Sequence, residues 1–268
     1  MIPTDLIDLL ENTWTSTSAL GAQLTEAQWK MPSELPGWTV QDTLSHLIGG
    51  ERMMQRLPPT THVAASADHV KNPIGANNEN DVDSRRSSSG AQVIAEWNDL
   101  VALRLHTLRN ADDAYFAVET MTPTGPGTVA DFLHIRIMDC WLHEQEMRRV
   151  TGIVGNEAGG CAKHALNRLI RTIPIVVGKR AGAPEGATVA FNIAAPVPHS
   201  LHCTITNGRG AVSDGLGTDA LTTINLDSTT FFQLATGRVT ADDSKHKWSA
   251  TGDTDLAYRV VSQFNMMI

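Results

Sequence analysis

The first 155 or so residues carry a repeated helical pattern of apolar side chains, and this pattern constrains the possible folds of the chain more than any other feature. In residues 2–24, leucines and a tryptophan recur at mixed three- and four-residue steps, which predicts an amphipathic helix. Residues 40–56, 87–108 and 128–151 have the same pattern, and Thr39 with Asp42 forms a capping-box pattern at the start of residues 40–56. Four such helices in one unit predict a four-helix bundle. Residues 58–80 and the segment TMTPTGPGT are expected to be irregular.

The pattern of residues changes from helical to mixed helix and strand after a glycine-rich stretch at residues 152–160. One more helix is expected at 162–177. Residues 188–194, 201–206, 220–226 and 247–250 have the alternating or β-rich character of strands, and helices are expected at 229–236 and 253–264. The sequence therefore predicts two domains, a four-helix bundle over residues 1–157 and a small α+β domain over 158–268.

The net charge and the cysteine count restrict which classes of partner the protein can bind and which cellular compartment it can work in. The 268 residues have a formal net charge of -8, and no cluster of Lys and Arg indicates a nucleic-acid or polybasic membrane surface. No apolar run approaches the ~20 residues that span a bilayer, and the acidic N-terminus does not resemble a secretory signal. Three widely spaced cysteines form no disulfide framework, so we expect a cytoplasmic protein.

Asp139 and His143 stand four residues apart, which puts a carboxylate and an imidazole on one helix face. His46 lies on another expected helix. Two histidines and a carboxylate form a three-ligand set that leaves positions open on a divalent metal, as a catalytic site requires. The alternative is a surface hydrogen-bonded pair beside an unrelated structural histidine. Both helices are apolar around these residues, which favours a buried polar face that needs a partner.

Three residues close to this set in the sequence have expected roles of their own, and for Arg136 two roles are open. Arg136 shares the face and could form a salt bridge with Asp139 or Glu146, or could bind a substrate carboxylate. Glu146 could hold the second ring nitrogen of His143. Cys140 points away around the helix and is expected to be buried packing rather than a nucleophile.

Three segments carry a family resemblance: GWTVQDTLSHLIGGE, IGANNENDVDSRR and HIRIMDCWLHEQEMRR. They resemble the mycothiol-dependent maleylpyruvate isomerase family of actinobacteria, which belongs to the DinB-like bundles. The stretch FFQLATGRVTADDSKHKWSATGDTDLAYRVV is similar to the C-terminal domain of that family, which is related to sterol-carrier folds. The resemblance covers nearly the whole chain and is more specific for the fold than for the substrate.

The resemblance implies a metal triad of His46, Asp139 and His143, with zinc as the expected metal. It also implies the thiol cofactor mycothiol, whose sulfur would bind at an open position of the metal. Arg238, which follows Gly237, would approach the metal and hold a carboxylate or the thiol cofactor. From the residues alone, Arg238 needs no function beyond a helix C-terminus. Asn77, Asn78 and Glu79 match a recurrent element of unknown role, for which loop capping is an equal alternative.

The expected function is a metal-dependent enzyme that uses a low-molecular-weight thiol on a small electrophilic substrate, as an isomerase or an S-transferase. Arg136 and Arg238 are the candidate anion-binding residues. A metal-dependent hydrolase and a non-catalytic small-molecule or lipid binding module are the alternatives. The expected partners are the substrate and the thiol, with the protein a monomer or a small homo-oligomer.

Overall fold

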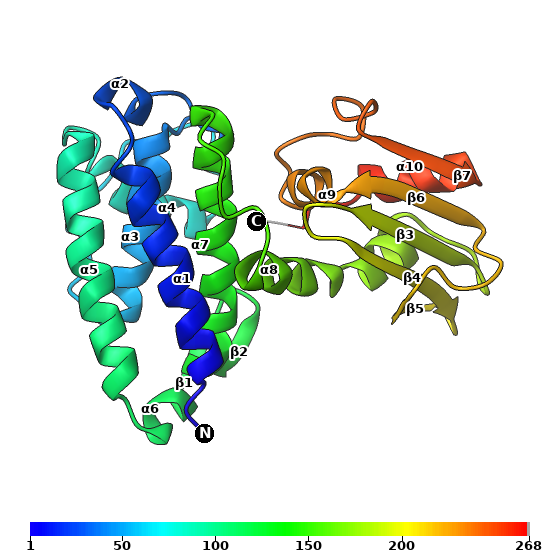
Figure 1. Ribbon diagram of the computed structural model, residues 1–268, viewed down its shortest axis with the longest axis horizontal. Helices are drawn as coiled ribbons and strands as arrows, with labels where there is room; N and C mark the ends of the chain where they lie inside the picture. The colour runs from blue at the N-terminus through cyan, green and yellow to red at the C-terminus, as the bar shows by residue number, and fades with distance from the viewer. Residues whose placement is uncertain (267–268) are drawn as a thin grey trace. The chain divides into compact units, whose positions relative to one another are not determined.

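Four long helices form a bundle at the N-terminal end of the chain (Figure 1): α1 (Thr4–Gly21), α3 (Val40–Met54), α5 (Gly90–Asn110) and α7 (Val129–Thr151). In this computed structural model, which describes residues 1–266, α1 packs against α5 and α7, and α3 packs against the same two helices. Each of the four long helices thus has two neighbours among the other three, and their apolar stripes meet in one core. Its largest buried side chains include Trp14, Leu44, Leu47, Trp97 and Trp141. The expected bundle is confirmed.

The helices begin where the sequence supplies capping side chains. Thr39 accepts a hydrogen bond from the backbone N–H of Asp42, and the Asp42 carboxylate accepts one from the backbone N–H of Thr39. This capping box was expected, and it starts α3 at Val40. Thr128 and Asp131 form the same arrangement at the start of α7. Both helices that carry the candidate metal ligands therefore have fixed N-terminal ends.

Two expectations for the connecting segments were wrong. Residues 58–80 are not irregular throughout, because α4 (Pro73–Asp83) begins there, with Asn72 as its N-cap and Pro73 at its first position. The segment TMTPTGPGT is not a loop but makes most of a hairpin of β1 (Glu119–Thr122) and β2 (Gly125–Thr128). Two short helices complete this unit, α2 (Glu26–Trp29) and α6 (Asp113–Ala117).

The chain divides into two compact units, Met1–Asn156 and the residues from Glu157 on. The second unit contains a five-stranded sheet with the order β5-β4-β3-β6-β7. The strands are β3 (Thr188–Ala194), β4 (His199–Thr206), β5 (Arg209–Asp214), β6 (Thr222–Asp227) and β7 (Trp248–Gly252). Only β3 and β6 pair in parallel, and the other neighbours are antiparallel. The expected α+β class is confirmed, although β5 was not predicted.

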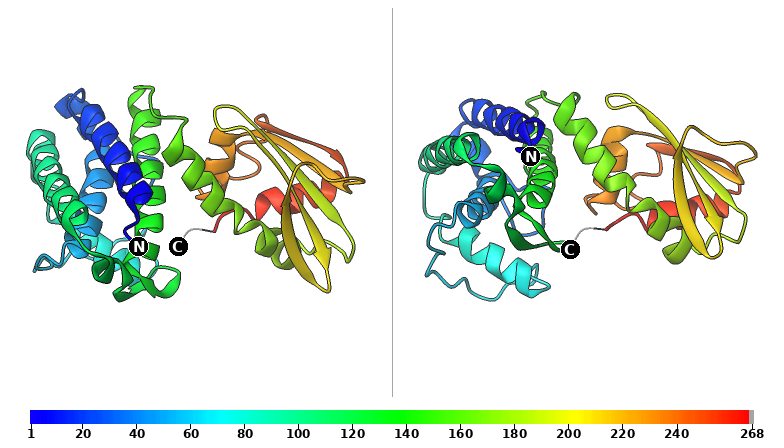
Figure 2. Two further views of the ribbon diagram at one scale, coloured as in Figure 1. Left: turned by 60° about the horizontal axis from the view of Figure 1, so that its bottom comes forward. Right: turned by 90° about the horizontal axis from the view of Figure 1, so that it is seen from below.

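The helices of this unit lie on one face of its sheet (Figure 2). They are α8 (Gly160–Ile170), α9 (Ser228–Ala235) and α10 (Thr254–Ser262), with a π-helical turn at Ile175–Arg180. The helix expected at 162–177 is therefore wrong in its extent, because α8 ends at Ile170. Pro174 follows four residues later and cannot donate a backbone hydrogen bond, which accounts for the interruption.

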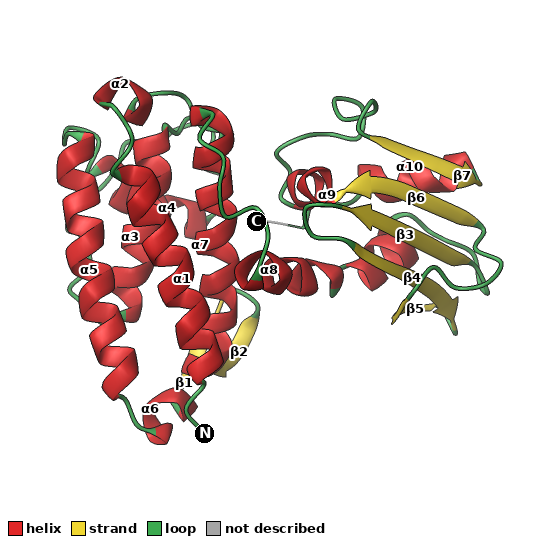
Figure 3. Cartoon of the chain, in the orientation of Figure 1, coloured by secondary structure: helices red, strands yellow, loops and turns green. Residues whose placement is uncertain are grey.

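The distribution of helix and strand along the chain is clear in Figure 3, with the helical unit preceding the mixed one. None of the helices in the described part of the chain has the length and apolar composition needed to cross a bilayer. All three cysteines are buried, and none of them forms a disulfide.

Candidate metal centre

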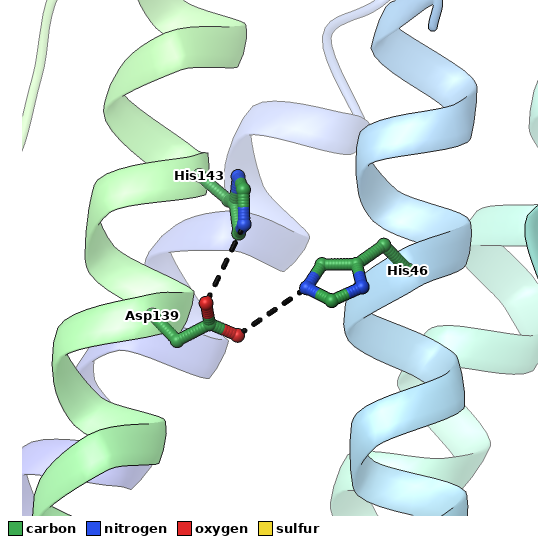
Figure 4. A group of neighbouring side chains, drawn as sticks. All are labelled: His46, Asp139 and His143. Carbon is green, nitrogen blue, oxygen red and sulfur yellow. Dashed lines mark ion pairs between the residues drawn. The ribbon is translucent and has the colours of Figure 1, made fainter. Parts of the chain in front are cut away.

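Three potential ligands converge between α3 and α7 (Figure 4). His46 projects from the middle of α3, and Asp139 and His143 project from successive turns of α7. Nε2 of His46 lies 3.5 Å from Asp139 Oδ2, and Nε2 of His143 lies 3.5 Å from Asp139 Oδ1. The two imidazole rings approach edge to face, with their centroids 5.0 Å apart. The structure thus brings the predicted triad together.

The donor set fits a divalent metal. One ligand atom from each of the three residues lies within 4.8 Å of the others. In a tetrahedral site with bonds of about 2.0–2.1 Å, neighbouring ligand atoms are about 3.3–3.4 Å apart, close to the 3.5 Å found between each imidazole and the carboxylate. Two imidazoles and one carboxylate would leave coordination positions for a water, a thiol or a substrate.

His143 is oriented by Glu146, as the spacing predicted. Its Nδ1 donates a hydrogen bond of 2.6 Å to the buried Glu146 carboxylate, which leaves Nε2 to face Asp139. A carboxylate on the second ring nitrogen is the usual way to fix a metal-binding histidine. Burial opposes the charged imidazolium, but the Glu146 and Asp139 carboxylates outweigh it and raise the pKa of His143 to about 9.

Asp139 is held by Arg136, whose Nη1 donates to Oδ2 at 2.6 Å. The same guanidinium donates through Nε to Glu51 at 2.9 Å and through Nη2 to the Leu47 carbonyl and the Cys140 sulfur. Each of its nitrogens is thus engaged inside the bundle, which favours the salt-bridge role of Arg136 over substrate binding. Burial would raise the pKa of Asp139, but Arg136 and His143 outweigh it and hold that pKa well below its usual value.

Behind Arg136 lies a buried ionic network that the sequence analysis missed. Glu51 is fully buried and accepts from Arg136 and, at 3.1 Å, from Nε of the equally buried Arg104. Gly50 makes room for this arrangement, because a Cβ there would lie 2.7 Å from Arg136 Nη1. A signal was present: Glu51 stands seven residues after Leu44, so an acid falls on the apolar face of its helix and requires a buried partner.

His46 is held differently from His143. Its Nδ1 is buried and has no hydrogen-bond partner among the described residues. The Trp38 ring lies against the imidazole, with centroids 5.4 Å apart and an interplanar angle of 37°. Burial lowers the pKa of His46 below its usual value, although the hydrogen bond and charge of Asp139 act in the opposite direction. The sequence analysis did not single out Trp38.

The remaining candidates lie as follows. Cys140 is buried, and burial raises the pKa of its thiol far above the usual range, in keeping with the expected packing role. Glu79 is a buried residue of α4 and not part of a loop cap. Arg238 belongs to the second unit, where its backbone N–H donates to Gln233 and its Nη1 to the Thr236 carbonyl at the end of α9. Its role toward a metal or thiol stays a prediction.

A helical bundle with two histidines and a carboxylate meeting between two of its helices is a typical metalloprotein arrangement. The family model described as the mycothiol maleylpyruvate isomerase N-terminal domain matches residues 10–148, and the chain belongs to this family. The recognition made from the sequence motifs is therefore confirmed.

Solved structures with the same fold include the mycothiol-dependent maleylpyruvate isomerase and a histidine-to-alanine mutant of it. They share 14% and 15% identity with this chain, with TM-scores of 0.59 and 0.57, and the matches cover 92% of each chain. The sterol carrier protein 2-like 2 of Aedes aegypti matches 37% of this chain and 96% of its own, at 18% identity and a TM-score of 0.31. No curated protein gives a match.

Proposed function

We propose that this protein is a metal-dependent enzyme that uses a low-molecular-weight thiol, mycothiol, on a small electrophilic substrate, as an isomerase or an S-transferase. The observation that carries the proposal is the convergence of His46, Asp139 and His143 in a chain of this family. The fold is shared with a mycothiol-dependent maleylpyruvate isomerase over nearly its full length, which supports the same class of chemistry. Zinc is the metal we propose, since two imidazoles and a carboxylate suit it.

A bound divalent metal would lower the pKa of a ligating thiol and so supply a thiolate nucleophile near neutral pH. The chain's own residues prepare for this role. Glu146 fixes the ring of His143 with Nε2 toward the site, and Arg136 keeps the Asp139 carboxylate ionised and in place. The side chains of the three candidate ligands are between 9% and 17% exposed, which limits water at the site and strengthens these charge interactions.

We assign the two arginines different tasks. Arg136 is a positioning residue, because its donors are engaged with Glu51, Asp139 and the α3 backbone. Arg238 is the residue we propose for binding an anionic group of the thiol or the substrate, as the family resemblance implies. A guanidinium suits a carboxylate because it can offer two parallel donors.

A reducing compartment suits this chemistry. Cys140, Cys161 and Cys203 are all buried and form no disulfide, and we propose that the protein works in the cytoplasm.

The test is a set of conversion assays on the zinc-loaded protein, with maleylpyruvate and chlorobimane as electrophiles. We expect conversion that requires both zinc and mycothiol and that is lost in a His46→Ala variant. Hydrolysis of either electrophile with zinc but without thiol would establish a metal-dependent hydrolase instead. No conversion of either electrophile, together with no binding of mycothiol, would contradict the proposal and favour a binding module.

A further inference from the structure

The two histidines of the candidate metal centre are oriented by different devices. His143 has the usual one, a carboxylate on its second ring nitrogen at 2.6 Å. His46 lacks it, because its buried Nδ1 has no hydrogen-bond partner in the part of the chain that the structure describes. A ring without that bond can rotate about its side-chain torsions unless packing restrains it. The other ring nitrogen, Nε2, faces Asp139 at 3.5 Å and is the atom that would bind the metal, so packing must restrain the ring on its Nδ1 side.

Trp38 is placed to do so. Its ring lies against His46 with centroids 5.4 Å apart, and it stands one residue before the capping box that starts α3. The indole N–H of Trp38 donates a hydrogen bond of 2.8 Å to Oε2 of Glu79 on α4. Direct contacts therefore connect Glu79 of α4 to the Trp38 indole, and the indole to the His46 imidazole.

Glu79 is itself fixed on several sides. Its side chain is 3% exposed, its Oε2 lies 3.0 Å from Nε2 of His69, and its Oε1 lies 2.6 Å from Nη2 of Arg86. His69 lies directly over the Gly37 backbone, where a Cβ would be 2.3 Å from Nδ1 and where φ is +78°. A carboxylate with three such partners is a rigid anchor for the indole.

The segment that carries Trp38 is also tied down. The Trp38 carbonyl accepts from the backbone N–H of Ser33 at 2.8 Å, which closes the turn. Glu34 in the same turn forms a two-bond ion pair with Arg149 of α7, at 2.8 and 2.6 Å. The indole is therefore held by α4 at its N–H and by α7 through its turn.

We propose that Trp38 and Glu79 are positioning residues for His46: Glu79 fixes the indole, and the indole fixes the imidazole in the orientation that binds metal. The inference rests on the proposed function, since it requires that His46 be a metal ligand. It also gives a role to Glu79, the acid of the Asn77–Glu79 element. Removing partners that orient metal ligands typically weakens metal binding about 10–100-fold.

The test measures cobalt, whose visible spectrum reports ligand geometry and whose release to a chelator reports affinity. Trp38→Leu removes the ring and should release cobalt at least about tenfold faster, with a changed spectrum. Trp38→Phe keeps a ring but loses the bond to Glu79, and Glu79→Ala removes the acceptor. Each of these two variants should accelerate cobalt release less than Trp38→Leu does. The double variant Trp38→Phe/Glu79→Ala should release cobalt no faster than Glu79→Ala alone, because both changes break the same indole–carboxylate bond.

Asp83→Asn is the matched control. Asp83 lies one turn after Glu79 on α4 and, like Glu79, pairs with Arg86 and with a histidine of the preceding segment, His62. We expect its loss to leave the cobalt spectrum and release rate unchanged. If the Trp38 and Glu79 variants melt earlier but match the wild type in both readouts, the two residues are only structural and the inference is overturned. If the wild-type protein binds no cobalt, the proposed function falls as well.

Discussion

Metal binding to this protein should release close to one proton at neutral pH, and His143 should be its source. Only the neutral imidazole binds a metal, and the pKa of His143 in the metal-free protein is raised to about 9. At pH 7 about 1% of the ring is then neutral, so the apparent affinity should be about 100-fold below its limit at high pH. The apparent affinity for the metal should rise about tenfold per pH unit up to pH ~8.5. His46, whose pKa is lowered, is already neutral and adds no proton.

Calorimetric titration of zinc in buffers of different ionisation enthalpy measures this release directly. The matched variant is Glu146→Gln, which keeps a hydrogen-bond acceptor but removes the charge that most strongly favours the imidazolium. In this variant the release should fall and the pH dependence should flatten. A proton lost from metal-bound water would persist in it, so the comparison separates the two sources. Release near zero in the wild type at pH 7–8, or equal release in both proteins, would refute the reasoning.

Three further variants test the surroundings of the centre. Glu51→Gln removes the buried carboxylate that pairs with both Arg104 and Arg136 and leaves Arg136 with Asp139 alone, so chemical denaturation should show a loss of about 3–5 kcal/mol in the free energy of unfolding; a loss below 1 kcal/mol would contradict this. Gly50→Ala should weaken zinc binding by displacing Arg136, and it should also lower stability, though by less than Glu51→Gln, because the buried ion pairs of Arg136 are disturbed while alanine favours the helix; unchanged affinity would show that Arg136 does not position Asp139. Cys140→Ala should keep thiol-dependent conversion, since the buried thiol is not ionised; complete loss in a folded protein would assign it a catalytic role.

The ligand set was predictable because part of its geometry is local. Asp139 and His143 share a face by helical spacing alone, and Glu146 follows at the distance that reaches the ring. His46 required the additional expectation that its helix packs beside theirs, which the bundle pattern supplied. The Thr39 cap was readable for the same reason, since its partner is three residues away.

The residues that position the metal ligands, and some of the strands, could not be predicted from patterns of neighbouring residues in the sequence. Trp38 and Glu79 are 41 residues apart, and their bond exists only because α4 packs against α3. The β1–β2 hairpin was missed because its Gly, Pro and Thr residues indicate a turn, while backbone pairing holds the strands. Strand β5 was missed because its sequence, RGAVSD, has little alternation and is stabilised by pairing with β4.

The metal content of the purified protein, measured by elemental analysis beside a His143→Ala variant, tests the central claim most directly. The account predicts about one zinc or other divalent ion per chain in the wild type and its loss in the folded variant. Absence of metal from both proteins, with folding intact and no uptake on adding zinc, would contradict the claim that His46, Asp139 and His143 form a metal centre.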